Sequence, residues 1–283
     1  MDSWMFYAVL GMLQVGGMTA LYKVPASKQI DKYVLTACAF FFCLVVAGLT
    51  LLPFIAFDLR AIILALIWGT GYAIMTLMQM HALHKHDTSG VFPFTSLASN
   101  VLVIFGGVLL LSETISPLQW VGVAASVFLF IGAYWNEKVR FFVDVLPSFM
   151  LIALLSTFIK FVQKAGSVSV EVHNFIFWEL FFAFLASLVI MLIATRKHLS
   201  LLPFRNPATL LYAFAIGALN FGSTYMIVKA LSLGPISLVY VILGLYTFFT
   251  TMFAALLFKE KITAKSLLFI ALSFLVVLLI KLG

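Results

Sequence analysis

Residues Val91–Trp120 read VFPFTSLASNVLVIFGGVLLLSETISPLQW and decide the fold of this chain. An apolar run of membrane-spanning length ends in Ser-Glu113-Thr, and Pro117 then leads into a second apolar run. A similar stretch, Gly234–Lys265, reads GPISLVYVILGLYTFFTTMFAALLFKEKITAK and has Glu260-Lys-Ile at the matching place. The two glutamates are 147 positions apart (260 − 113), about half of the 283 residues, which predicts an internal duplication.

The composition places the chain in a membrane. Hydrophobic residues make up 64% of the sequence and charged residues only 10%, whereas soluble domains carry about 25% charge. The apolar runs are continuous and about 20 residues long, unlike the alternating segments of about 10 residues in a membrane barrel. The net charge of +7 comes from Lys and Arg in short loops and is therefore no nucleic-acid signal. The predicted fold is an all-α polytopic membrane protein.

Ten predicted membrane spans fill the chain. They cover residues 3–22, 33–57, 61–80, 90–111, 118–135, 141–163, 173–195, 208–231, 235–258 and 264–282. The loop Asn136–Arg140 separates two predicted five-span repeats, 1–137 and 138–283, and Leu-Leu-Pro-Phe follows the second span of each, at Leu51–Phe54 and Leu201–Phe204. Because five is odd, the second copy must be inverted in the membrane, an architecture in which alternating access arises around a midplane site.

The distribution of positive charge predicts an orientation. Of the 17 Lys and Arg residues, twelve lie in the loops between spans 1 and 2, 3 and 4, 5 and 6, 7 and 8, and 9 and 10. The other five lie toward the side of the termini: Arg60, Lys160, Lys164, Lys229 and Lys281. Taken alone, this count places both termini outside the cytoplasm. Without a signal-peptide cleavage pattern, the first span is expected to be retained, in a bacterial inner membrane.

With these features the chain resembles the drug/metabolite transporter superfamily, in particular its ten-span EamA-like members. The resemblance rests on the five-plus-five repeat, on Glu113 and Glu260 at the ends of spans 4 and 9, and on Ala230-Leu-Ser-Leu-Gly-Pro235 before span 9. It covers the whole chain and implies a transporter without specifying a substrate. That family commonly has cytoplasmic termini, against the charge count, and an Arg early in spans 2 and 7; here span 2 has no charge and span 7 has Glu179.

Charged residues inside spans are the sharpest functional candidates, because each costs about 2.5–3.5 kcal/mol at a helix centre on insertion scales. Glu179 is the only carboxylate inside a predicted span. Beside Trp178, it would bind a cationic group of a substrate or exchange protons as a coupling site. Lys160 lies inside span 6 and would pair with Glu179 or with a substrate carboxylate. The alternatives are a position at the headgroup level or a long side chain that reaches the membrane interface.

Polar and aromatic residues on spans 3, 4, 8 and 9 are candidates for the lining of a hydrated cavity. On span 3, Trp68, Tyr72 and Gln79 share one helix face. The candidates on the other three spans are Asn100, Asn220, Thr224, Tyr225, Tyr240 and Tyr246. Such a set suits a small zwitterionic solute, and its rings also suit cations. The alternative is that hydroxyl groups bond to their own helix backbone and that rings mark the membrane interfaces.

Three other groups are interpreted as structural. Glu113 and Glu260 lie at helix ends, so we expect them to cap or dock the links that follow spans 4 and 9. The histidine-rich segment His81–Asp87 lies in a predicted loop without a fixed helical face, which argues against a metal site. Cys38 and Cys43 fall within one apolar run and are expected to pack there as small residues.

The predicted function is a secondary transporter that moves a small amino-acid-like or zwitterionic metabolite by alternating access, with protons as a candidate coupling ion. No cofactor and no catalytic residue are expected, since the sequence contains no ATP-binding, nucleophile-elbow, zinc-protease or dinucleotide motif. The expected partners are the small-molecule substrate and the lipid bilayer, not nucleic acid, and the expected state is a monomer or a homodimer. The alternatives are an organic-cation or drug transporter and, in a different class, a lipid scramblase or intramembrane lipid enzyme.

Overall fold

The chain is helical throughout the part that the structure, a computed structural model, describes. That part comprises residues 3–27, 30–85, 88–134, 139–194, 207–258 and 264–283. Helices suit this sequence because they satisfy every backbone hydrogen bond within one apolar segment. Seven of the described helical segments are long and apolar enough to cross a membrane, one of them comprising two consecutive α-helices, and three shorter apolar helices accompany them. The predicted all-α polytopic membrane protein is therefore confirmed.

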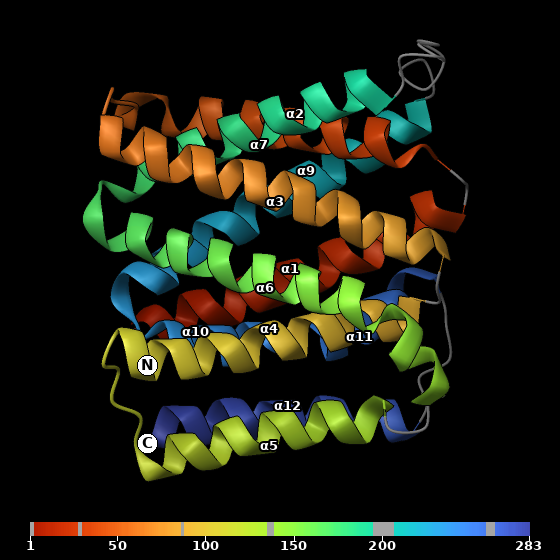
Figure 1. Cartoon of the computed structure of the whole chain (residues 1–283), viewed down its shortest axis with the longest axis vertical. Coiled ribbons are helices and arrows are strands. Elements are labelled where there is room, and N and C mark those ends of the chain that lie inside the picture. Colours follow the sequence, from red (N-terminus) through yellow and green to blue (C-terminus); the bar gives the residue numbers. More distant parts are fainter. Residues whose placement is uncertain (1–2, 28–29, 86–87, 135–138, 195–206, 259–263) are drawn as a thin grey trace.

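The helices lie side by side in one bundle (Figure 1). The first part of the chain forms α1 (Ser3–Ser27), α2 (Lys32–Leu51), the 3-10 helix η1 (Leu52–Phe54), α3 (Leu59–Lys85), α4 (Thr88–Leu110) and α5 (Pro117–Tyr134). The second part forms α6 (Val139–Ser169), α7 (Val172–Ala194), α9 (Pro207–Leu233), α10 (Ile236–Gly244), α11 (Tyr246–Phe258) and α12 (Ala264–Leu282). The start of α1 and the end of α12 lie on the same side of the bundle.

Two predicted spans end later than expected: α3 continues to Lys85 and α6 to Ser169, so the start of each predicted loop is helical. Two other predicted spans are interrupted, and the first is span 33–57. The α-helix α2 ends earlier, at Leu51, and the 3-10 helix η1 follows with Pro53 near its start. Proline has no N–H group to continue the α-helical hydrogen-bond ladder, so the helix stops before it. An extended link then leads to α3, and Ala56 in this link bonds to Asn174 and Trp178 of α7.

The second difference is span 235–258, which is two helices rather than one. The helix α10 ends at Gly244, Leu245 forms a turn, and α11 begins at Tyr246. At this break the N–H of Leu245 bonds to the carbonyl of Ile242, so the backbone tightens to a three-residue turn. Broken helices at membrane depth are tolerated where the break lines a cavity.

Two helix pairs approach each other closely through a glycine. On α3, Gly69 lies against α7, where an added Cβ would collide with the carbonyl oxygen of Glu179. On α9, Gly217 lies against α2, where an added Cβ would collide with the carbonyl oxygen of Ala39. Small residues of this kind let helices pack closely inside a membrane. The helix α3 also packs on α6, and α9 also packs on α1.

The helices α5 and α12 pack on each other at one edge of the bundle (Figure 1). The largest group of buried apolar side chains is centred on α10 and extends to α1, α4, α5, α9, α11 and α12, with Met5, Ile242 and Phe249 among its members.

Candidate functional site

A cavity of about 180 Å³ lies between α1, α3, α4, α6, α9, α10 and α11. Its lining includes seven of the predicted site residues: Trp68, Tyr72, Asn100, Lys160, Thr224, Tyr240 and Tyr246. The break between α10 and α11 borders the cavity, since Gly244 also lines it. Lys160 is the one charged side chain of the lining within the described part of the chain.

In the described part of the chain, the side-chain nitrogen of Lys160 contacts only uncharged groups. Its Nζ donates to Ser99 Oγ and to Asn100 Oδ1, at 2.8 Å each. The same atom lies 4.6 Å from the centroid of the Tyr240 ring, a cation–π contact. The ion pair with Glu179 that the sequence allowed is not formed between these two residues. The Lys160 amine therefore has no carboxylate partner among the described residues, and an anionic group of a ligand could pair with it.

Glu179 is fully buried behind the wall of the cavity and does not line it. Its Oε2 accepts a long hydrogen bond of 3.5 Å from Gln163 Nε2, and its Oε1 has no partner among the described residues. Gln163 does line the cavity, and its Oε1 accepts the hydroxyl of Tyr240 at 3.0 Å. A buried carboxyl group with so few hydrogen bonds costs stability, so a structural role alone does not account for it.

Two aromatic rings of α3 form another part of the cavity lining. The rings of Trp68 and Tyr72 stack with their centroids 4.6 Å apart. The hydroxyl of Tyr72 donates to Asn220 Oδ1 at 3.1 Å, which joins α3 to α9. Stacked rings held in this way lose little conformational freedom on binding and can contact the apolar part of a small ligand.

Besides Glu179 and Asn220, two predicted residues lie away from the cavity lining. Trp178 donates its Nε1–H to the carbonyl of Ala56 at 3.1 Å, in the link between η1 and α3. Tyr225 belongs to a separate polar cluster at the start of α7. The side chain of a third predicted residue, Gln79, lies outside the described residues.

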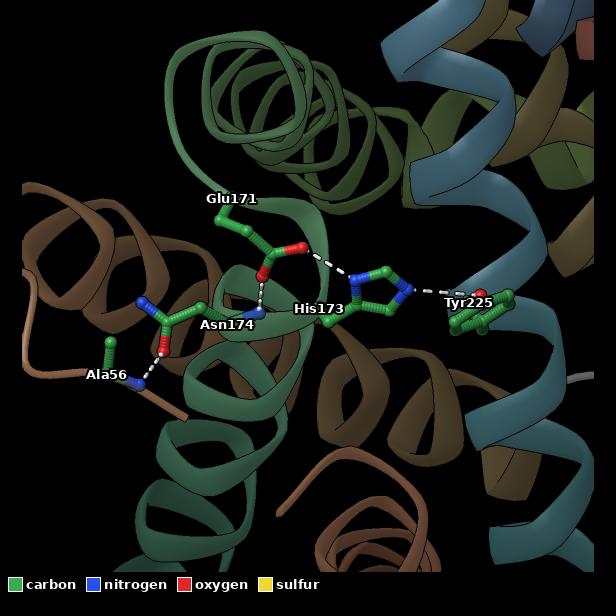
Figure 2. Close-up of polar contacts among 5 residues, drawn as sticks. All are labelled: Ala56, Glu171, His173, Asn174 and Tyr225. Atoms are coloured by element: carbon green, nitrogen blue, oxygen red, sulfur yellow. Dashed lines mark hydrogen bonds and ion pairs between the residues drawn. The ribbon is translucent and has the colours of Figure 1, made fainter. Parts of the chain in front are cut away.

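Figure 2 shows this separate polar cluster. Glu171 Oε1 lies 2.6 Å from His173 Nδ1, and Glu171 Oε2 accepts the N–H of Asn174 at 2.6 Å, as a helix cap does. His173 Nε2 lies 3.3 Å from the hydroxyl of Tyr225, and Asn174 Oδ1 accepts the N–H of Ala56 at 2.9 Å. The cluster thus ties the link before α3 to α7 and α9.

The hydrogen bonds of this cluster also set the charge state of Glu171. Partial burial would raise the pKa of this carboxyl group, but hydrogen bonds from the backbone of Asn174 and His173 and from the His173 ring outweigh it. The net pKa of Glu171 is therefore lower than its ordinary value. Glu171 is an anion with a full set of partners, unlike Glu179.

Glu113 has a structural contact, but it caps the start of α10 instead of the link that follows α4. Its Oε1 accepts the N–H of Ile236 at 2.6 Å, and its Oε2 accepts the N–H and the hydroxyl of Ser237 at 3.0 and 2.6 Å. Ser112 adopts a left-handed conformation with φ of 54°, which turns the chain after α4. The equivalent glutamate, Glu260, lies outside the described residues, as do the side chains of His81–Asp87.

Lys164 stabilises the turn between α9 and α10, next to the residues that Glu113 caps. Its Nζ donates to the carbonyls of Leu231 and Gly234, at 2.7 and 2.8 Å, at the end of α9. A cation at this place also complements the partial negative charge of a helix C-terminus. The turn between α9 and α10 is therefore clamped by a lysine on one side and a glutamate on the other.

A wider groove of about 1030 Å³ lies beside this clamp, at the ends of α3, α4 and α6. Its walls include apolar side chains such as Ile63 and Phe161, together with Arg60. Glu113 and Lys164 also border it, but both are already engaged with α9 and α10. The groove therefore offers fewer available polar groups than the cavity does.

Two parts of the site are not among the residues predicted from the sequence. The first is the contribution of α1, whose Val15, Met18 and Thr19 line the cavity. The second is Gln163, which lies three positions after Lys160 and so on the same face of α6. That spacing was the available signal, since a polar residue one helical turn from an intramembrane lysine shares its environment.

The comparisons with known proteins agree with the fold. The model of the EamA-like transporter family matches residues 143–282. A search of curated protein sequences finds no match. A solved protein crystal structure superposes on this chain with a TM-score of 0.75 at 12% sequence identity, and the alignment covers 99% of this chain and 96% of that one. At this identity the likeness shows the fold alone.

Proposed function

Since the model of the EamA-like transporter family matches residues 143–282, we propose that the chain is a membrane transporter of the drug/metabolite transporter type and moves a small zwitterionic metabolite by alternating access. The observation that carries this proposal is Lys160, an amine with no carboxylate partner among the described residues, in a small cavity between helices of both halves of the chain.

The proposal includes two inverted repeats, residues 1–137 and 138–283. The helix contacts support them, because α3 packs on α6 and α7 in the same way that α9 packs on α1 and α2. The matched glycines Gly69 and Gly217 support them as well. In this relation α1, α2 and α3 correspond to α6, α7 and α9. Transporters built from inverted repeats bind substrate near the middle of the membrane, between the repeats.

The size and chemistry of the cavity favour a small solute with a carboxylate. Sites for drug-sized ligands measure about 300–1,000 Å³, whereas this cavity measures about 180 Å³. In the proposed complex the substrate carboxylate binds Lys160 and replaces part of its contact with Ser99 and Asn100. The ammonium group of the substrate faces the rings of Tyr72 and Tyr240, since aromatic faces attract cations.

We further propose that protons drive the cycle through Glu179. This carboxyl group is buried and has one weak hydrogen bond, to Gln163, which itself lines the cavity. Burial favours the protonated form of such a carboxyl group, so it would release its proton only when water or a partner group from the cavity reaches it. Its exchange of a proton with the cavity would therefore link proton flow to substrate movement.

The two alternatives receive less support. An organic-cation transporter would need a carboxylate facing the substrate, but the described cavity lining contains none and Glu179 lies behind it. A lipid scramblase would use the groove at the ends of α3, α4 and α6. The charged clamp residues of that groove, Glu113 and Lys164, already bond to other helices.

A binding screen tests the proposal. Purified protein is heated with single amino acids and, in parallel, with their carboxyl amides, and the unfolding temperature is measured, because a bound ligand stabilises the folded state. We expect the amino acids to stabilise the protein and the amides not to. The variant Lys160→Met should bind about 10- to 150-fold more weakly, since a hydrogen bond to a charged group contributes about 1.5–3 kcal/mol.

The matched control is Lys281→Met, which removes an exposed lysine from the last turn of α12. This variant should bind like the unaltered protein. Equal affinity of Lys160→Met and Lys281→Met for the stabilising ligand would contradict the proposed site. Stabilisation by organic cations or lipids alone would contradict the proposed substrate class.

A further inference from the structure

We propose that Gln163 is a positioning residue that transmits the protonation state of Glu179 to Tyr240, and through it to Lys160, by reversing its side-chain amide. This inference rests on the proposed role of Glu179 in proton coupling. Glu179 lies outside the cavity, and Gln163 would let it act on Tyr240 and Lys160 inside the cavity.

The amide of Gln163 lies between two groups with opposite hydrogen-bonding roles. Its Nε2 donates to Glu179 Oε2 at 3.5 Å, and its Oε1 accepts the hydroxyl of Tyr240 at 3.0 Å. Gln163 is buried on α6, Glu179 comes from α7 and Tyr240 from α10. The side chain therefore connects three helices by one chain of hydrogen bonds.

This arrangement fits a Glu179 without a proton, because a carboxylate can only accept hydrogen bonds. When a proton from cavity water binds the carboxylate, the resulting carboxyl group has an O–H to donate. Gln163 is its one hydrogen-bond partner among the described residues, and the Nε2 group that faces it cannot accept. Reversal of the amide turns the Gln163 carbonyl oxygen toward Glu179 and satisfies the new donor.

The reversal necessarily changes the hydrogen bond at Tyr240. The Gln163 NH₂ group now faces the tyrosine, so the hydroxyl of Tyr240 must accept where it donated before. The ring of Tyr240 lies 4.6 Å from Lys160 Nζ, the proposed anchor of the substrate carboxylate. Protonation of Glu179 thus turns the hydroxyl hydrogen of a side chain that lines the cavity. Linked hydrogen bonds of this kind polarise one another in a low-dielectric interior.

No other charged group competes with Gln163 for this role in the described part of the chain. The titratable groups close enough to interact with the charge of Glu179 are Cys43 on α2, Tyr72 on α3 and Tyr240 on α10. All three are uncharged near neutral pH in their ordinary state. Lys160 shares α6 with Gln163 but bonds to α4 instead. Gln163 is therefore the direct connection from Glu179 to the cavity.

Infrared difference spectroscopy between low and high pH tests the inference on purified protein without any substrate. The carboxyl band of Glu179 is identified by its loss in Glu179→Gln, the amide band by its loss in Gln163→Leu, and the tyrosine band by its loss in Tyr240→Phe. In the unaltered protein we expect all three bands to change with the same midpoint pH. In Gln163→Leu the carboxyl band should remain while the tyrosine band disappears from the difference spectrum.

A matched control is Gln14→Leu, which removes a different intramembrane glutamine, on α1, whose buried Oε1 has no hydrogen-bond partner among the described residues. It should leave the tyrosine band unchanged. If Gln163→Leu does not fold, Gln163→Met replaces it with a side chain of similar length. Persistence of the tyrosine band without Gln163 overturns the proposal, as does the absence of a carboxyl band from Glu179. Failure of the substrate proposal alone would leave all of these bands in place.

Discussion

The contact of α3 with α7 and the contact of α9 with α2 share one packing device but differ in one side chain. In each, a glycine lets two backbones meet: Gly69 approaches the carbonyl of Glu179, and Gly217 approaches the carbonyl of Ala39. The approached residue carries a carboxyl group in the first contact and only a methyl group in the second. The close packing therefore does not depend on that side chain, which leaves it available for chemistry in one half of the chain alone.

The helix α6 contains a similar contrast between two lysines one turn apart. Lys164 donates to the backbone carbonyls that end α9, where it holds the chain in place. Lys160 donates to side-chain oxygens of α4, which a ligand can replace. Lys164 thus has backbone partners that stay in place. Lys160 and Glu179, the proposed functional groups, have side-chain partners that a ligand or a proton can replace.

The largest expected effect comes from placing a second carboxyl group at the matched position. Ala39 is buried, and Ala39→Glu would bury a charge without a partner. Removing the partner of a buried charge costs about 3–5 kcal/mol, and we expect a loss of this size in the free energy of unfolding, measured by chemical denaturation. Glu179→Gln, which keeps size and shape, should fold normally. A well-folded Ala39→Glu would show that the two contacts do not differ in their tolerance of charge.

A smaller effect is expected from adding a methyl group at each of the two glycine contacts. Gly69→Ala and Gly217→Ala should each lower the free energy of unfolding by about 1–3 kcal/mol, because the added methyl group would overlap the facing backbone. Denaturation of both variants gives the comparison. Similar losses would support the same packing role in both halves, whereas a loss in only one variant would break the match.

The hydrogen bond between Tyr72 and Asn220 should contribute less. Tyr72→Phe keeps the stacking on Trp68 and removes only the hydroxyl. We expect a loss of about 0.5–1.5 kcal/mol in the free energy of unfolding, the usual net contribution of one hydrogen bond. Trp68→Phe serves as a comparison, because it changes the stack and keeps the hydrogen bond. An unchanged stability in Tyr72→Phe would mean that this bond does not hold α3 to α9.

The smallest effect concerns the dependence of stability on pH at Glu171. The pKa of this carboxyl group is lower in the folded protein than its ordinary value of 4.5. Its contribution to stability is therefore present above that value and is lost as the pH falls through the lower, folded-state pKa. Unfolding temperatures measured across this acidic range should fall more in the unaltered protein than in Glu171→Gln. Identical profiles would show that the cluster in Figure 2 does not stabilise the charged form.

Most of the fold follows from the sequence, because continuous apolar runs leave only helices as a solution in a membrane. The break between α10 and α11 does not, since Gly244 and Leu245 lie within an apolar run and no charge or proline marks the turn. Tertiary packing sets that boundary. The early end of α2 could have been predicted from Pro53, which cannot continue an α-helix, although the residues around it are apolar enough to extend the predicted span.

The site is predictable only in part, for a physical reason. Residues such as Lys160 and Tyr72 stand out because a polar or charged group inside a span is costly. Whether a residue faces the cavity depends on helix rotation, which the sequence does not specify for helices that are apolar all around. Thus Trp178 bonds to the link before α3, and Glu179, the next residue, lies behind the wall. The role of Gln163 depends on contacts with two other helices, and these exist only in the folded chain.

One measurement tests most directly the claim that the unmatched carboxyl group couples transport to protons. The protein is reconstituted into lipid vesicles, a proton gradient is imposed, and accumulation of the amino acid that stabilises it best is followed for the unaltered protein and for Glu179→Gln. We expect the unaltered protein to accumulate the amino acid above equilibrium. The variant should exchange internal for external amino acid but should not accumulate it. Gradient-driven accumulation by Glu179→Gln at the unaltered rate would contradict the account.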